Sequence, residues 1–347
     1  MKRPFLPALL LVVLLLPPIW LRAEVDNTFD TPVTLKQVES SQEAVRDGWQ
    51  LRGVWEYDAA SLMFGGYSAL LALDDGRLQA FSDRGTRFTF VQPDRPRSDR
   101  DKSQETPDRL MEPQPVEASH ALDLWDIESA ARDPGTGQYW LGFENTHGFH
   151  RYSPAGEPDG VRLIGSTVNW ASNSGAEAMA RLRDGRFLVI PEGGKEGLIY
   201  PADPVTGVEA TTFEYRTPIS GFGITEAVQL PDGRLLILLR NVVWGIPPFE
   251  ARLAIAEIPE PGDEQVLEPR IVLNLTQVAP PENYEGLAVR ERGDGSFDLW
   301  IISDDNLSVM QRTLLVKLRF DPAKGLRAGA AAKAANPPKQ TKQKARE

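Results

Sequence analysis

The chain has 347 residues, of which 41% are hydrophobic, so it can bury a large core. It has no Cys, which excludes a disulfide framework and a lipoprotein attachment site. The net charge of −11 would repel phosphates, so nucleic acid is excluded as a partner, whereas divalent cations suit such a surface.

Residues 1–23 have the pattern of a secretory signal peptide. Basic Lys2 and Arg3 precede an apolar run from Phe5 to Trp20, and Ala23 suits the last position before a cleavage site. We therefore expect a periplasmic or secreted protein. If the segment is not cleaved, it stays as an N-terminal anchor and brings the protein into contact with the membrane.

Five copies of a short pattern follow within residues 24–323. Each copy has a polar anchor residue among small and apolar residues, then a turn, an apolar run and a polar cluster. The anchors are Ser68, Glu128, Glu177, Glu226 and Glu285. A spacing of about 50 to 60 residues is typical of β-propellers, in which each repeat forms one small sheet, or blade. The sequence therefore predicts an all-β fold, a single β-propeller of four-stranded antiparallel blades, and we expect a monomer.

The third and fourth copies divide most clearly into strands. We expect strands at 176–182, 187–191, 197–200 and 210–215, and at 226–230, 235–239, 253–257 and 270–275. The fifth copy offers only 285–290, 299–303 and 314–320, so the N-terminal strand 51–57 is expected to complete it and close the ring. This favours five blades. Six is the alternative, because residues 33–38 and the insert 93–121 are unassigned.

The last part of the chain differs in composition. Residues 324–347 are rich in Ala, Lys, Pro and Gln, which predicts a disordered basic tail. Three basic residues in segment 1–23 and a net charge of +6 on the tail leave −20 for the propeller body. Tryptophans in the body are expected to pack between blades; they are Trp55, Trp140, Trp170, Trp244 and Trp300.

The anchors are expected to form a ring, because the first strand of every blade faces the central channel. Glu128, Glu177, Glu226 and Glu285 would repel one another there unless a metal ion, protons or basic side chains lay among them. An oxygen-only site favours Ca²⁺ as the cofactor, with Asp304 as a further ligand. The alternative is a structural ring that accepts hydrogen bonds from neighbouring blades.

A second recurrent position lies where the second strand of each blade ends, and it should share a face with the ring. Arg84 and Arg240, with Asn241 and Asn306, would bind a small anionic ester substrate there. Asp83, Glu192 and His147 are the candidate catalytic residues. For Arg84 and Arg240 the alternative is a salt bridge to a neighbouring blade.

Several stretches resemble a known family. Gly65-Gly66-Tyr67-Ser68-Ala69-Leu70 with Ser82-Asp83-Arg84-Gly85, Gly175-Ala176-Glu177-Ala178-Met179, and Asn283-Tyr284-Glu285-Gly286-Leu287 with Ser303-Asp304-Asp305-Asn306 are similar to bacterial phytase-like proteins, described as having esterase-like activity of phytase. The resemblance covers about Leu51 to Phe320 and implies an exported β-propeller that hydrolyses phosphoric or carboxylic esters. Motifs of serine-hydrolase elbows, zincins and phosphate-binding loops are absent.

Two functional hypotheses follow from the sequence. The first is a hydrolase with a cation-assisted site at one mouth of the channel. The second is a non-catalytic propeller that binds a ligand or protein at the same mouth and uses its glutamates only as structure.

Overall fold

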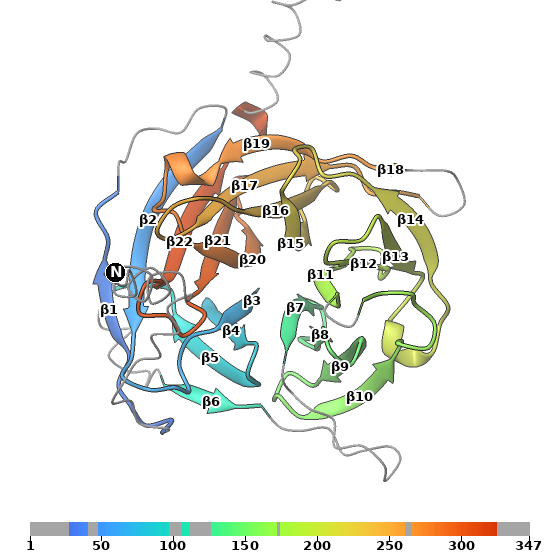
Figure 1. Cartoon of the computed structure of the whole chain (residues 1–347), viewed down its shortest axis with the longest axis horizontal. Coiled ribbons are helices and arrows are strands. Elements are labelled where there is room, and N and C mark those ends of the chain that lie inside the picture. Colours follow the sequence, from blue (N-terminus) through green and yellow to red (C-terminus); the bar gives the residue numbers. More distant parts are fainter. Residues whose placement is uncertain are drawn as a thin grey trace, which may run out of the picture.

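The computed structural model describes residues 28–40, 48–96, 106–110, 126–171, 174–260 and 266–324. Within these ranges the chain is almost entirely β-structure, arranged as five blades around a central axis (Figure 1). This confirms the predicted five-bladed propeller. The predicted signal segment 1–23 and nearly all of the predicted tail lie outside the described residues, and no described helix is long and apolar enough to cross a membrane.

Four blades are built from consecutive strands, each starting at the axis. They are β3 (Tyr67–Ala72), β4 (Arg77–Ser82), β5 (Thr86–Val91) and β6 (Pro107–Arg109); β7 (Ile127–Arg132), β8 (Tyr139–Phe143), β9 (Gly148–Tyr152) and β10 (Pro158–Leu163); β11 (Ala176–Arg181), β12 (Phe187–Pro191), β13 (Glu196–Tyr200) and β14 (Thr211–Tyr215); and β15 (Gly223–Gln229), β16 (Leu235–Val242), β17 (Phe249–Ala256) and β19 (Arg270–Asn274). Single 3-10 turns, η1 (Pro204–Thr206) and η2 (Leu275–Gln277), lie between strands.

The fifth blade joins the two ends of the propeller. Its strands β20 (Asn283–Glu291), β21 (Phe297–Asp304) and β22 (Thr313–Phe320) are followed in the sheet by the N-terminal strand β2 (Trp49–Asp58). Strand β2 pairs antiparallel with β22 from Trp49 opposite Phe320 to Tyr57 opposite Thr313. The expected closing strand is therefore confirmed, and it satisfies the edge that β22 would otherwise expose.

Where they are described, the two segments that allowed a sixth blade form edge strands of other blades. Residues 34–37 form β1 (Thr34–Gln37) on the outer edge of the closing blade, and β6 within the insert is the outer strand of the first blade. A short strand that the sequence did not predict, β18 (Val266–Leu267), pairs parallel with β14 and widens the third blade.

The core is divided into five clusters, one in each gap between neighbouring blades. Alternate strand residues turn to opposite faces of each blade, so both faces are apolar and both are buried. Trp55, Trp140 and Trp300 lie in these gaps as expected. Trp244 was predicted wrongly, because it lies on the β16–β17 loop and its side chain is fully exposed (103%).

Candidate functional site

A β-bulge at the start of each inner strand positions the anchor residues. The pairing skips Ser68 in β3, Glu128 in β7, Glu177 in β11 and Glu285 in β20, so each is the extra residue of its bulge. A bulge re-aims the side chain of the extra residue away from the regular alternation. Glu128, Glu177 and Glu285 act electrostatically on one another, which places these three carboxyl groups together at one end of the channel. We call this end the carboxylate mouth.

The fourth blade breaks the predicted ring. In β15 the bulged residue is Thr225, and Glu226 pairs with Leu238 one position further along. Glu226 is fully buried, and its Oε1 accepts hydrogen bonds from the backbone N–H groups of Met179 (3.3 Å) and Ala227 (2.8 Å). Burial raises the pKa of Glu226 well above its usual range, and no other carboxyl group contributes to that shift. Glu226 therefore ties neighbouring blades together and is not a member of the carboxylate mouth.

The carboxyl groups of the mouth hold protons more tightly than free ones. Burial, followed by repulsion from neighbouring carboxylates, raises the pKa of Glu128, Glu177 and Asp304 well above their usual range. Glu177 is 5% exposed, and no described group donates a hydrogen bond to its carboxylate. Other acidic residues act on the same group; they are Asp83, Glu144 and Glu192.

Arg240 is the cation at the centre of this group. Its Nη1 donates to Glu285 Oε1 and to Asn283 Oδ1, both at 2.6 Å, and its Nη2 lies 3.8 Å from a carboxylate oxygen of Glu192. Asn283 in turn donates to Glu285 (2.9 Å) and Asp304 (3.3 Å). Burial raises the pKa of Glu285, while Arg240 lowers it. Of the cations considered from the sequence, the described residues supply a guanidinium.

The ligand atoms of this site suit a metal ion, but the distances between the carboxyl groups do not. All the acidic and amide donors are oxygens, which suits Ca²⁺. In the described part of the chain, however, no three His, Asp or Glu side chains converge closely enough to hold a metal ion. The carboxyl groups are spread around Arg240, so binding of a cation requires them to move together.

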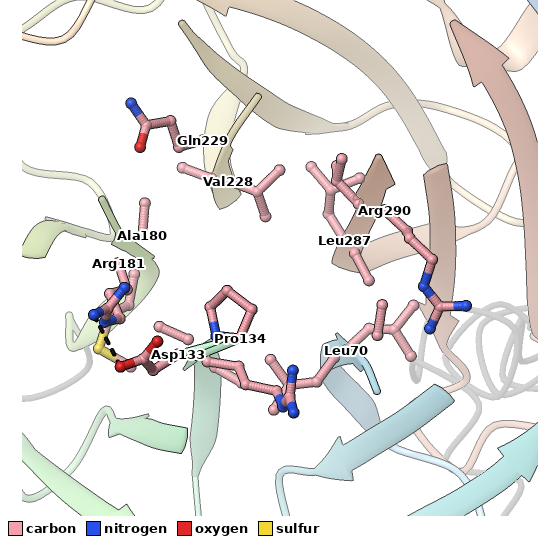
Figure 2. Close-up of a pocket in the computed structure, with 18 of the residues that line it drawn as sticks. Leu70, Asp133, Pro134, Ala180, Arg181, Val228, Gln229, Leu287 and Arg290 are labelled. Atoms are coloured by element: carbon pink, nitrogen blue, oxygen red, sulfur yellow. Dashed lines mark hydrogen bonds and ion pairs between the residues drawn. The ribbon is translucent and has the colours of Figure 1, made fainter. Parts of the chain in front are cut away.

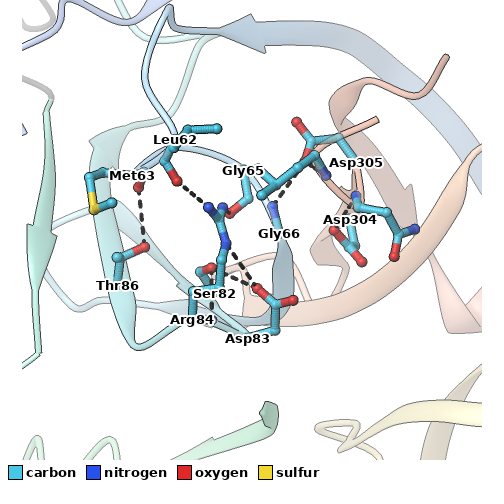
Figure 3. Close-up of polar contacts among 12 residues, drawn as sticks. Leu62, Met63, Gly65, Gly66, Ser82, Asp83, Arg84, Thr86, Asp304 and Asp305 are labelled. Carbon is cyan, nitrogen blue, oxygen red and sulfur yellow. Dashed lines mark hydrogen bonds and ion pairs between the residues drawn. The ribbon is translucent and has the colours of Figure 1, made fainter. Parts of the chain in front are cut away.

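Arg84, predicted to bind substrate, is held by the backbone of the loop that precedes β3 (Figure 3). Its guanidinium donates to the carbonyl groups of Leu62, Phe64 (3.4 Å) and Gly65 (2.9 Å) and contacts the neighbouring Asp83 (3.4 Å). Arg84 therefore supports this loop and is not available to a ligand. Asp83 stays at the mouth, where burial raises its pKa.

The same loop explains the Gly65-Gly66 pair. The two residues have φ values of +96° and +68°, and Asp305 Oδ1 accepts a hydrogen bond from Gly66 N (3.0 Å). A Cβ at Gly65 would lie 2.5 Å from that Oδ1 atom, so a larger residue does not fit. Asp305 also accepts from Thr313 Oγ1 (3.2 Å). The motifs at 65–66 and 303–306 thus join the first blade to the last.

The remaining predicted residues are distributed around the rim. Glu192 is 42% exposed and faces Arg240. Asn306 donates through Nδ2 to Gln311 Oε1 (2.9 Å) within its own loop, and Asn241 lies beside Gly221. His147 packs edge-on against Trp170 at 5.9 Å, and its backbone N–H donates to the carbonyl of Glu144 (3.0 Å). The structure brings together Asp83, Glu128, Glu177, Glu192, Glu285, Asp304 and Arg240.

Asn283 is a site residue that the sequence analysis missed. It lies two residues before Glu285 in the motif Asn283-Tyr284-Glu285, and it contacts Arg240, Glu285 and Asp304. The sequence analysis compared only positions that recur in every repeat. Asn283 has no counterpart in the other repeats, so it was overlooked. Glu144, which directly follows β8, was also not predicted; burial and the carboxylates of Glu192 and Asp126 raise its pKa.

Comparisons with known proteins give one family match. The family model "Phytase-like: Esterase-like activity of phytase" matches residues 63–307. The comparison with curated proteins finds no match.

Among solved structures, an endo-arabinase from Bacteroides thetaiotaomicron is similar at 11% identity and a TM-score of 0.44, covering 73% of this chain and 93% of that chain. An exo-1,5-α-L-arabinanase from a bovine ruminal metagenomic library has 12% identity and a TM-score of 0.44, and the alignment covers 73% of this chain and 92% of that chain. Hydrazine synthase of Kuenenia stuttgartiensis has 13% identity and a TM-score of 0.36; the alignment covers 70% of this chain and spans 58% of that one.

Proposed function

The chain belongs to the phytase-like family, described by its esterase-like activity of phytase, and on this premise we propose that it hydrolyses phosphoric or carboxylic esters at the carboxylate mouth. One observation carries the proposal. Glu177 and Glu285, from two blades, converge with Arg240, and the carboxyl groups there have raised pKa values. Titratable groups with perturbed pKa values in a channel mouth are typical of sites for general acid and base catalysis.

The proposed reaction uses groups that lie around Arg240. Arg240 Nη2, only loosely engaged with Glu192 at 3.8 Å, binds the ester oxygen that gains negative charge. The half-exposed Glu192 takes a proton from water, and the water oxygen bonds to the phosphorus or carbonyl carbon. The ester bond to the leaving alcohol breaks, and a protonated carboxyl group such as Glu177 gives its proton to the alcohol oxygen. Asp83 lies at the rim of the same mouth as a further base.

Calcium is part of the proposal as an activator. The carboxyl groups around the Arg240 guanidinium outnumber it, which supports a role for calcium. A bound cation would relieve the repulsion among Glu128, Glu177 and Asp304. We expect Glu285→Gln to lower calcium affinity, measured by titration calorimetry. Unchanged affinity together with reduced stability would favour the structural role instead.

The test of the enzyme is a substrate panel. Phytate and nitrophenyl esters of phosphate and of short acids are assayed with the wild type and with Glu177→Gln. We expect turnover of at least one ester and a loss of about a hundredfold or more in the variant, as is common for a general acid. Arg216→Gln, which changes an exposed ion pair with Glu268, is the control. No turnover of any ester by the wild type would contradict the proposal.

A second candidate function has its own support. Every large hydrophobic side chain that is exposed in the described residues lies in a loop or at a strand end on the face of the propeller that carries the carboxylate mouth; these are Leu163, Ile219, Val242, Trp244, Ile246, Val309 and Met310. Exposed apolar groups gathered on one face are typical of a binding surface. A non-catalytic propeller that binds a ligand or protein there is therefore the alternative. It predicts that Trp244→Ser abolishes binding of that partner without changing the melting temperature.

The exported location, periplasmic or secreted, and the monomeric state remain our predictions. A fusion of residues 1–40 to a reporter enzyme tests export, and sedimentation velocity tests the oligomeric state.

A further inference from the structure

The opposite end of the channel holds a cavity of about 530 Å³ (Figure 2). All five inner strands supply its walls, which are apolar: Leu70, Ala130, Ala180, Val228 and Leu287 come one from each of β3, β7, β11, β15 and β20. We call it the distal funnel. Its volume falls within the range of small-molecule sites, which are mostly apolar with a few polar groups at defined positions.

The rim of the distal funnel is basic. Arg132, Arg181, Arg183 and Arg290 line it together with Asp74, Asp133 and Glu291. Three of the arginines are paired: Arg132 with Asp74, Arg181 with Asp133 (3.0 Å), and Arg183 with Glu291 (3.2 Å). The rim therefore has one guanidinium more than it has carboxylates.

Arg290 is that additional guanidinium. It makes no ion pair with any described carboxylate; it donates to the carbonyl of Leu73 and lies over the Trp300 ring, 5.5 Å from its centroid. Burial and the nearby Arg95 guanidinium lower the pKa of Arg290, and the more distant carboxylates of Asp74, Asp75 and Asp298 offset this only in part. A half-buried cation with a second cation beside it is stabilised by an anion, because an anion offsets both the lost hydration and the repulsion.

The two ends of the channel thus differ in charge. The carboxylate mouth surrounds Arg240 with acidic groups, whereas the distal funnel has a surplus guanidinium on its rim. Glu226 lies between them, hydrogen-bonded to the backbone of Met179 and Ala227, which also line the funnel. At the distal funnel the surplus guanidinium favours an anion.

We propose that the distal funnel is a second ligand site, separate from the carboxylate mouth, which binds a small monoanion with an apolar body. The apolar part lies against Leu70, Val228 and Leu287, and the anionic group accepts hydrogen bonds from Arg290. The proposal does not depend on the hydrolytic activity.

The test is titration calorimetry with three probes of equal chain length: decanoate, decanol and decyltrimethylammonium. We expect one decanoate site per chain, with weaker binding of decanol and the weakest binding of the cation. Arg290→Gln should weaken decanoate binding about ten- to hundredfold, the usual worth of a hydrogen-bonded charge, and leave decanol unchanged. Arg290→Lys keeps the charge and should retain binding in part.

Two controls separate this site from the mouth and from general charge. Arg216→Gln removes an equal charge at the other end of the molecule and should leave decanoate binding unchanged. Glu177→Gln, which tests the hydrolase, should also leave it unchanged. Absence of saturable decanoate binding to the wild type overturns the proposal, and so does equal binding by folded Arg290→Gln and Arg216→Gln proteins.

Discussion

Replacing Arg240 by Gln removes the cation that compensates the carboxylate mouth. The side chain of Glu285 is 9% exposed and that of Arg240 is 20% exposed, and they are joined by a 2.6 Å hydrogen bond. Without the guanidinium, Glu285 is left as a buried carboxylate beside Glu177 and Asp304. Its pKa, already raised by burial and held down in part by Arg240, should rise further.

The expected magnitude follows from this burial. Removing one partner of a buried ion pair costs about 3–5 kcal/mol, and the partial exposure of Arg240 argues for about 3 kcal/mol near pH 8. A group whose pKa is higher in the folded state loses its stabilising proton as the pH rises through the folded pKa. Because the pKa of Glu285 is raised, the carboxyl group takes up a proton as the pH falls, so at pH 5 we expect the variant to lose less, approaching about 1 kcal/mol, the worth of the lost hydrogen bonds.

Urea unfolding of the wild type and the Arg240→Gln variant at both pH values measures the difference. Arg252→Gln is the matched control, because Arg252 lies in the same blade and is 15% exposed, but it pairs with a single carboxylate, Glu250, that is 38% exposed. Its cost should change little with pH. An Arg240→Gln cost that is equal at both pH values would refute the role of Arg240 as the counter-ion.

Three further predictions concern other parts of the channel. In urea unfolding, the free energy of unfolding of Glu226→Gln should lie within about 1 kcal/mol of the wild type, whereas that of Glu226→Ala should be lower by about 2 kcal/mol. The reason is that only the amide keeps an acceptor for the backbone N–H groups. Equal losses in the two variants would contradict this. Gly65→Ala should lower the free energy of unfolding by about 2 kcal/mol or more. Gly185→Ala, at a residue with similar φ but open space around it, should lower it by less. Equal effects would show that the clash of the new Cβ with Asp305 does not destabilise the protein. Calcium should raise the melting temperature relative to chelator, and no shift would contradict the proposed cation site.

The repeated pattern was sufficient to predict the propeller. The alternation of apolar residues, the Asp-Gly turns and the spacing of the anchors are local properties, so β12 was located to the residue; β16 begins where expected but continues three residues further, to Val242. The closing strand could also be predicted, since the last copy was one strand short. Strand β18 could not, because its two residues are defined only by their parallel pairing with Thr211–Tyr215 (β14).

The site was predicted only in part, and the bulges explain why. A bulge changes the register by one residue without any clear signal in the sequence, so Glu226 was aligned with Glu177 and Glu285 although Thr225 holds their position. Which cation compensates the carboxylates depends on contacts between blades, such as Arg240 of β16 with Asn283 of β20.

The sequence by itself determined the propeller fold and the acidic character of one mouth, and it favoured five blades over six, because these follow from composition and from short-range periodicity. The tertiary structure alone decided that Arg84 supports a loop, that Glu226 ties blades together, and that an arginine-rimmed funnel lies at the other end. These outcomes depend on which residues from distant strands meet at the axis, and that is set by the packing of five blades against one another.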